Sequence, residues 1–252
     1  MEVANAATAP KLPGSWELFK SSWQTLLNNR NLFAWPIVIV FLIDFVFGIA
    51  EYFTASPAMM LASWLVGKLA EIWVLVVIAK IIKDLHSKTG ATTNYMQAAL
   101  ALLPVATVTA VIMGLLNGLL YFALIVPGII FSFYWAFTLF ALAVTDKKYK
   151  AAMNYSKYLV KGRAAVLFGY MLFFAIVGGL IALLLVAPVL LIAGTFEQNL
   201  LVEYLNNNLA AGVYVLAIAE IFTAFGLIYT AKLYLAFEET KPAVTATPVV
   251  KV

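Results

Sequence analysis

The sequence predicts an all-α integral membrane protein with six transmembrane helices arranged as three hairpins. The chain of 252 residues is 64% hydrophobic and 11% charged, with a mean hydropathy of +0.98, whereas soluble proteins carry about 25% charged residues. Its apolar residues form six long blocks, each near the roughly 20 residues that a bilayer-spanning helix needs. Its basic residues lie in alternate loops between these blocks.

The six apolar blocks give the predicted spans and the limits of one transmembrane domain over residues 14–237. In chain order, the spans are Leu32–Phe53, Met59–Ile82, Ala98–Phe122, Val126–Thr145, Ala164–Ala193 and Leu209–Phe237. Residues 1–13 precede the domain as a short tail that we expect to be disordered. Residues 238–252 are rich in Val, Thr, Ala and Pro, a composition typical of a disordered linker.

The second hairpin, over residues 98–145, allows two arrangements because it contains almost no polar side chains. Asn117 and Ser132 are its only strongly polar residues, so the turn between its helices must be tight and lie near Pro127. Proline fits the first turn of a helix, where its missing N–H group has no partner to lose. Two complete spans are the expected arrangement, and a shallow re-entrant hairpin is the alternative.

The positions of lysine and arginine predict which loops face the cytoplasm. Basic residues precede the first span and follow the second, fourth and sixth spans, whereas the opposite loops contain none. Cytoplasmic loops of membrane proteins carry an excess of basic residues, so we expect both termini in the cytoplasm and the protein in the inner membrane. Lys68, inside the second span, is the one basic residue that departs from this pattern.

A polar–apolar segment precedes each pair of spans on the predicted cytoplasmic side. The three segments are Ser15–Asn29, Thr92–Leu103 and Asp146–Arg163. In the third, apolar residues recur every three or four positions, and the lysines do the same one position along, which is typical of an amphipathic helix. Such helices lie in the membrane interface. The predicted unit is therefore an interfacial helix followed by a hairpin, repeated three times.

The third segment also supplies the predicted contacts with lipid headgroups. Its six basic residues are Lys147, Lys148, Lys150, Lys157, Lys161 and Arg163. An anionic membrane surface attracts each basic residue by about 1 kcal/mol, so the simplest role of this segment is an anchor on the cytoplasmic leaflet. The alternative is recognition of a specific lipid headgroup or of a partner protein.

Four charged residues inside the predicted spans are candidates for a functional site. They are Asp44, Lys68, Glu71 and Glu220. A charged side chain in the bilayer costs about 2.5–3.5 kcal/mol on insertion scales, so it requires a partner or a function. Lys68 and Glu71 are three positions apart and can form an ion pair that fixes the register of the first hairpin. The alternative is a site that binds a proton or a cation, with Lys68 as the counter-charge.

The residue types that most enzyme chemistry needs are missing from the sequence. It contains no cysteine and one histidine, His86, which excludes thiol catalysis and metal sites with several histidines. It contains no phosphate-binding, dinucleotide-binding or metalloprotease motif. We therefore expect no catalytic residues, no metal and no cofactor. Nucleic acid is not an expected partner, because the basic residues are placed at the predicted membrane surface.

Three short patterns together resemble a known family. They are Ser-Trp-Glu-Leu-Phe-Lys and the apolar residues that follow it within Ser15–Pro36, Pro-Gly-Ile at 127–129, and Ala-x-x-x-Ser-x-x-Leu-Val-Lys-Gly over Ala152–Gly162. The chain resembles the YciC-like integral membrane proteins and the related membrane domain attached to some glycerophosphoryl diester phosphodiesterases. The resemblance implies a multi-pass inner-membrane protein. It does not imply phosphodiesterase activity, because that activity needs a separate soluble barrel for which this chain leaves no room.

These observations predict a non-enzymatic membrane protein with a scaffold or membrane-organising role, whose partners are anionic lipids of the cytoplasmic leaflet. Two alternatives remain open. One is a small transporter or channel for a solute, an ion or protons, built around the four intramembrane charged residues. The other is an accessory subunit of a larger membrane complex, in which other membrane proteins are the partners.

Overall fold

The structure is a computed structural model that describes residues 11–54, 56–88, 94–145, 147–193 and 208–241. All secondary-structure elements within these residues are α-helices, as the sequence predicts. Most residues of the two predicted tails, 1–13 and 238–252, lie outside the described residues. The prediction that these tails are disordered therefore stays a prediction. The last helix ends at Glu239, slightly beyond the predicted limit of the domain.

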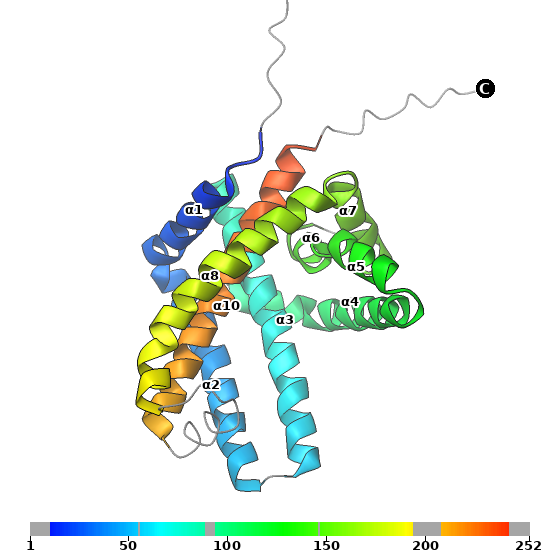
Figure 1. The fold of residues 1–252 in the computed structure, drawn as a ribbon. Coiled ribbons are helices and arrows are strands. Elements are labelled where there is room, and N and C mark those ends of the chain that lie inside the picture. The colour runs from blue at the N-terminus through cyan, green and yellow to red at the C-terminus, as the bar shows by residue number, and fades with distance from the viewer. Residues whose placement is uncertain (1–10, 55, 89–93, 146, 194–207, 242–252) are drawn as a thin grey trace, which may run out of the picture.

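Four long helices run between the two ends of the molecule and form its central bundle (Figure 1). They are α2 (Arg30–Thr54), α3 (Pro57–Ser87), α8 (Ala164–Ala193) and α10 (Leu209–Glu239). α2 and α3 form an antiparallel hairpin, and α10 packs against α2, α3 and α8. α3 begins at Pro57 because the Ser56 side chain accepts a hydrogen bond from the backbone N–H of Met59 and because proline suits a first turn.

The buried core lies in the half of the bundle at which α3 and α10 end. The buried residues of α3 begin at Ala70, and those of α10 begin at Ala224. Toward the other end, large apolar side chains are exposed, such as Leu184 and Leu191 of α8 at 73% each. Soluble proteins rarely expose a continuous apolar surface of this kind. The chain is therefore a helical protein embedded in a membrane.

Five described segments are long and apolar enough to cross a membrane. They are Arg30–Glu51, Tyr95–Ala123, Ile125–Val144, Ala164–Ala193 and Leu209–Glu239. Each of them coincides with one predicted span to within a few residues. The predicted span Met59–Ile82 lies in α3, which is not among the five and which carries Lys68, Glu71 and Lys80 in this stretch. The prediction of six spans is therefore not confirmed in number.

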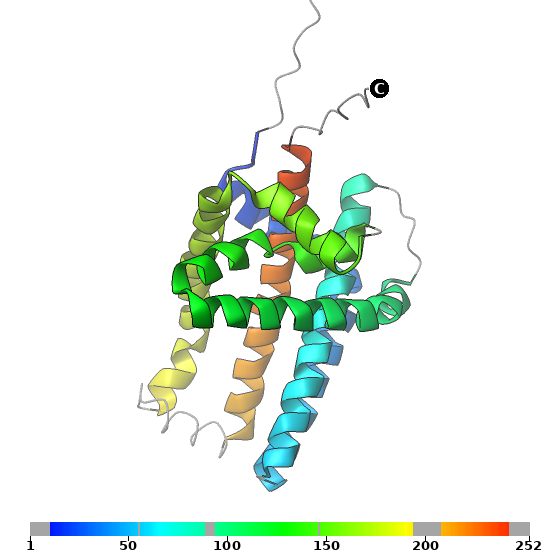
Figure 2. The same ribbon diagram turned by 90° about the vertical axis from the view of Figure 1, so that its right-hand side faces the viewer.

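The second predicted hairpin does not run alongside the others. Its first helix, α4 (Tyr95–Ala123), lies across the four-helix bundle in both views (Figures 1 and 2). After one residue, α5 (Ile125–Tyr134) returns along α4. A Cβ atom on Gly128 would lie 2.7 Å from the Tyr121 ring, so a side chain there would push the two helices apart. The tight turn is confirmed, whereas the arrangement as three aligned hairpins is not.

The fourth predicted span, Val126–Thr145, is interrupted in the structure. α5 ends at Tyr134, and α6 (Thr138–Val144) begins only after residues 135–137. α6 packs against α3 and against α7 (Lys150–Val160), and most of its side chains are buried. The second half of this predicted span therefore belongs to the protein core instead of facing lipid.

Separate amphipathic helices precede two of the three predicted hairpins in the described residues. α1 (Ser15–Asn28) precedes α2, and α7 precedes α8. Both lie at the end of the bundle where α3 and α10 finish (Figure 1). The predicted segment Thr92–Leu103 is not a separate helix, because from Tyr95 onward it forms the first turns of α4. The predicted repeat is therefore seen twice, not three times.

Candidate functional site

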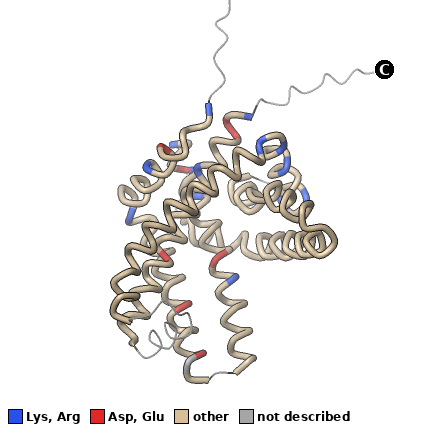
Figure 3. Tube along the Cα trace, viewed as in Figure 1, with Lys and Arg blue, Asp and Glu red and all other residues tan. Residues whose placement is uncertain are grey.

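The lysine and arginine residues gather at one end of the molecule (Figure 3). We call this the basic end, and it consists of α1, α7 and the last turns of α3 and α10. Lys68, near the middle of α3, is the exception that the sequence already indicates. The separation of basic residues along the bundle is thus confirmed.

The six basic residues predicted to contact lipid headgroups fall into two groups. Three of them are exposed, namely Lys148, Lys150 and Lys161. Lys147 instead lies 4.3 Å from the centre of the Tyr155 ring. Lys157 lies 5.2 Å from the centre of the Phe131 ring. An aromatic face attracts a lysine ammonium group, so these two lysines have partners within the protein that helical spacing alone does not indicate.

Arg163 points into the protein, where it joins the ends of two helices. Its guanidinium donates hydrogen bonds to the carbonyl groups of Leu159 (2.9 Å) and Phe237 (2.8 Å). It also donates to Thr240 Oγ1 (2.7 Å). Both carbonyls lie in the last turn of their helices, α7 and α10, where carbonyl groups lack helical partners. Burial lowers the pKa of Arg163, but arginine stays charged in proteins. Arg163 therefore caps α7 and α10 instead of facing outward as a lipid contact requires.

The run Ala152–Gly162, which carries part of the family resemblance, has a structural role. Ser156 is fully buried. Its Oγ donates a hydrogen bond to the Tyr134 carbonyl (2.7 Å) and accepts one from the Phe137 N–H group (3.0 Å). These two backbone groups flank the break between α5 and α6. Gly162 has a φ of 81°, a left-handed conformation that favours glycine, and it connects α7 to α8.

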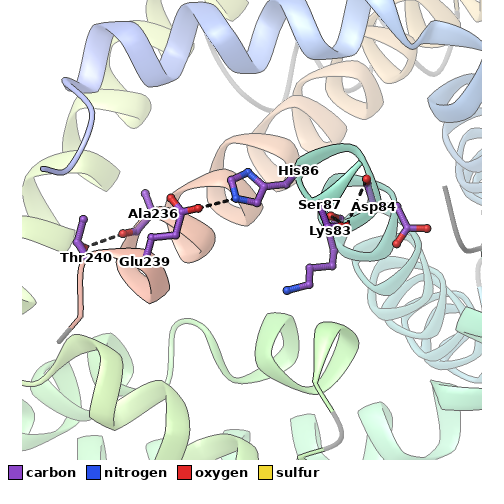
Figure 4. Close-up of polar contacts among 7 residues, drawn as sticks. All are labelled: Lys83, Asp84, His86, Ser87, Ala236, Glu239 and Thr240. Carbon is purple, nitrogen blue, oxygen red and sulfur yellow. Dashed lines mark hydrogen bonds and ion pairs between the residues drawn. The ribbon is translucent and has the colours of Figure 1, made fainter. Parts of the chain in front are cut away.

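A hydrogen bond between His86 and Glu239 joins α3 to α10 at the basic end (Figure 4). His86 Nε2 and Glu239 Oε1 are 2.6 Å apart, and the two side chains are 46% and 52% exposed. The adjacent Ser87 hydroxyl donates to the carbonyl of Lys83 within α3. Exposed ion pairs contribute about 0–1 kcal/mol to stability. The pair therefore orients the two helix ends and adds little to the stability of the fold.

The ion pair predicted within the second span is present in α3. Lys68 Nζ lies 2.7 Å from each carboxylate oxygen of Glu71. The two side chains are 50% and 53% exposed. Charge-assisted hydrogen bonds of this length are stronger than those between neutral groups. The pairing that the spacing of three residues indicates is thus confirmed.

The other two predicted residues, Asp44 of α2 and Glu220 of α10, are neighbours. The charges of Asp44 and of Glu71 in α3 both act on Glu220. Asp44 Oδ1 lies 3.6 Å from the position that a Cβ atom would take on Gly67, the residue before Lys68. All four predicted residues therefore gather where α2, α3 and α10 meet.

A groove between α2 and α3 reaches Asp44, one of these four residues. Its volume is about 400 Å³, and its lining includes Asp44, Glu51, Ser63 and Trp64. Two nearby carboxylates repel each other when both are charged, and a proton or a cation relieves that repulsion. Within the described ranges, no group of three acidic or histidine residues could hold a metal ion. The chemistry available to the cluster is therefore that of a proton or of a structural ion pair.

The fold and this cluster define a class, that of helical membrane-embedded proteins with a basic end and charged residues between the spans. No protein-family model matches the chain, and no curated protein or solved structure matches it. The resemblance to the YciC-like membrane proteins therefore stays a prediction.

Proposed function

We propose that this protein is a non-enzymatic inner-membrane protein whose basic end binds anionic lipid and organises the membrane around it. One observation carries the proposal: lysines and two amphipathic helices gather at the same end of a membrane-embedded bundle. Because basic segments of membrane proteins face the cytoplasm, the basic end and both termini are assigned to that side.

The exposed lysines of the α7 segment supply the attraction. Lys148, Lys150 and Lys161 are free to approach lipid phosphates, because their side chains are exposed. Each basic residue near an anionic surface contributes about 1 kcal/mol, so the three together favour anionic over neutral lipid by about 3 kcal/mol. This preference weakens as salt is added, because mobile ions screen surface charges.

We expect the K148Q/K150Q/K161Q variant to lose most of the preference for anionic lipid. The measurement compares the thermal stability of the full chain in phosphatidylglycerol liposomes with that in phosphatidylcholine liposomes and counts the lipids that copurify. The matched control is K148R/K150R/K161R, which keeps the charge and should behave like the wild type. Equal stability of the wild type in the two lipids would remove the proposed role.

Proton transport is a second candidate function, favoured by the charge of Asp44 acting on Glu220. Carboxyl groups between transmembrane helices are typical of proton pathways. Here Asp44 lines a groove, and the charges of Asp44 and Glu71 both act on Glu220. Lys68 is already paired with Glu71, which is what a cluster with only a structural role requires. For this reason lipid binding is the first proposal and transport is the second.

Proton flux into liposomes that contain the protein separates the two functions. With a pH-sensitive dye inside the liposomes, the lipid-binding role alone predicts no flux above that of protein-free liposomes. Transport predicts flux that is lost in Glu220→Gln and Glu71→Gln. The same flux should persist in Glu239→Gln, a matched control at the basic end. Flux that is lost in Glu220→Gln and Glu71→Gln but kept in Glu239→Gln would make transport the first proposal.

A further inference from the structure

An apolar groove of about 550 Å³ lies between α1, α8 and α10. Four residues of α1 form one wall, namely Trp16, Phe19, Lys20 and Trp23. The other walls come from Ile181 and Leu185 of α8 and from α10 between residues 218 and 225. Lys20 is the one charged side chain among the described residues that line it. A volume of this size is typical of sites that bind small molecules.

The wall of the groove at α1 is built from packed aromatic rings. The ring centres of Phe19 and Phe225 are 4.9 Å apart, and those of Trp23 and Phe225 are 5.3 Å apart. Both pairs meet edge to face, a favourable geometry for aromatic rings. Phe19 is buried, whereas Trp16 and Trp23 are 48% and 39% exposed. The groove therefore has a fixed inner wall and a rim of tryptophan.

The groove extends from α1, at the basic end, past the middle of α10 toward the opposite end of the bundle. Along α10 it runs from Phe225 back to Ile218, which corresponds to about 10 Å at the helical rise of 1.5 Å per residue. Lys20 lies at the α1 end, with Nζ 5.1 Å from the centre of the Trp16 ring. A ligand that fits must therefore have an apolar chain aligned with the spans and a negative charge near Lys20.

We propose that this groove binds one acyl chain of an anionic phospholipid from the surrounding bilayer, with the lipid phosphate at Lys20. The apolar walls match the chain, and the single lysine at the rim matches the charge of the headgroup. Tryptophan prefers the headgroup level of membranes, where Trp16 and Trp23 then lie. This inference rests on the proposed lipid-binding function. It adds a second lipid contact, which lies deeper in the membrane than the contact made by the exposed α7 lysines.

Filling the groove tests the proposal, and the chain offers a matched control. Leu185→Trp places a large side chain in the groove, whereas Leu184→Trp adds the same side chain one position away on a face that does not line it. The probe is phosphatidylglycerol with a photoreactive acyl chain, reconstituted with the full-length protein. We expect cross-links in the wild type to map to α1 and α10 and to fall to about a tenth in Leu185→Trp. Leu184→Trp should retain them.

The headgroup contact is tested with a second variant. Lys20→Gln should reduce cross-linking by phosphatidylglycerol to the level seen with phosphatidylcholine of the same chain, and leave the positions of the cross-links unchanged. Equal cross-linking in Leu185→Trp and Leu184→Trp would overturn the groove site. Label spread evenly over the exposed helices of the wild type would overturn it as well.

The two proposals fail separately. If the wild type prefers anionic liposomes but Leu185→Trp cross-links normally, the groove site alone is wrong. If the wild type shows no preference between phosphatidylglycerol and phosphatidylcholine, the proposed function itself is wrong, whatever the cross-links show.

Discussion

Replacing Ser156 with alanine is expected to lower the free energy of unfolding by about 2–4 kcal/mol. The substitution removes a single oxygen, but that oxygen bonds to both the Tyr134 carbonyl and the Phe137 N–H group at the break between α5 and α6. Neither backbone group has a helical partner at this point, and buried polar groups without partners are costly. Equilibrium unfolding in detergent micelles, followed by loss of helical signal, measures the change.

Ser22→Ala is the matched control for this experiment. Ser22 is also fully buried, but its hydroxyl donates to the Leu18 carbonyl within α1 at 2.7 Å. That carbonyl already accepts a helical hydrogen bond, so its loss leaves no backbone group unpaired. We expect a change within about 0.5 kcal/mol. Similar losses in the two alanine variants would show that Ser156 does not stabilise the break.

Replacing Arg163 with alanine is expected to destabilise the protein by about 2–4 kcal/mol. The variant leaves the carbonyls of Leu159 and Phe237 without a partner and removes the guanidinium that lies 4.3 Å from the centre of the Phe237 ring. Arg163→Lys should restore less than half of the loss, because an ammonium group cannot reproduce the planar fork of an arginine. Thermal unfolding of the full chain in one fixed lipid measures both variants.

Lys161→Ala separates this capping role from lipid binding. Lys161 lies two residues before Arg163 and is exposed, so its loss should change stability by no more than about 0.5 kcal/mol. The opposite pattern would contradict the assignment of Arg163. In that pattern, Arg163→Ala unfolds like the wild type but loses its preference for anionic lipid.

The limits of the helices could be predicted from the sequence, but the direction of α4 could not. Hydropathy indicates that a long segment avoids water, but it does not indicate the direction of the helix. α4 is apolar enough to span a membrane, yet it lies across the four-helix bundle. The break at residues 135–137 also carries no local signal, because Trp135, Ala136 and Phe137 include no glycine or proline. It depends on a serine that comes about twenty residues later in the chain.

The residues of the candidate site could be predicted from the sequence, but their arrangement could be predicted only in part. The pairing of Lys68 with Glu71 follows from helical spacing, which is a local property of the sequence. Asp44 and Glu220 belong to α2 and α10, which pack against each other, and no local pattern encodes which helices pack together. The same reason explains why Lys157 and Arg163 could not be told apart from the exposed lysines, since their partners lie on other helices.

The transverse placement of α4 gives the molecule an unequal cross-section. α2, α3, α8 and α10 reach the end opposite the basic end, whereas α1, α4, α5, α6 and α7 lie toward the basic end (Figures 1 and 2). The described part of the chain is therefore broader toward the basic end. If the four-helix bundle stands along the membrane normal, this shape displaces more lipid from the leaflet at the basic end. We expect a shape of this kind to cost the least elastic energy where the leaflet at its broad end is convex, so that the position of the protein would follow the curvature of the bilayer.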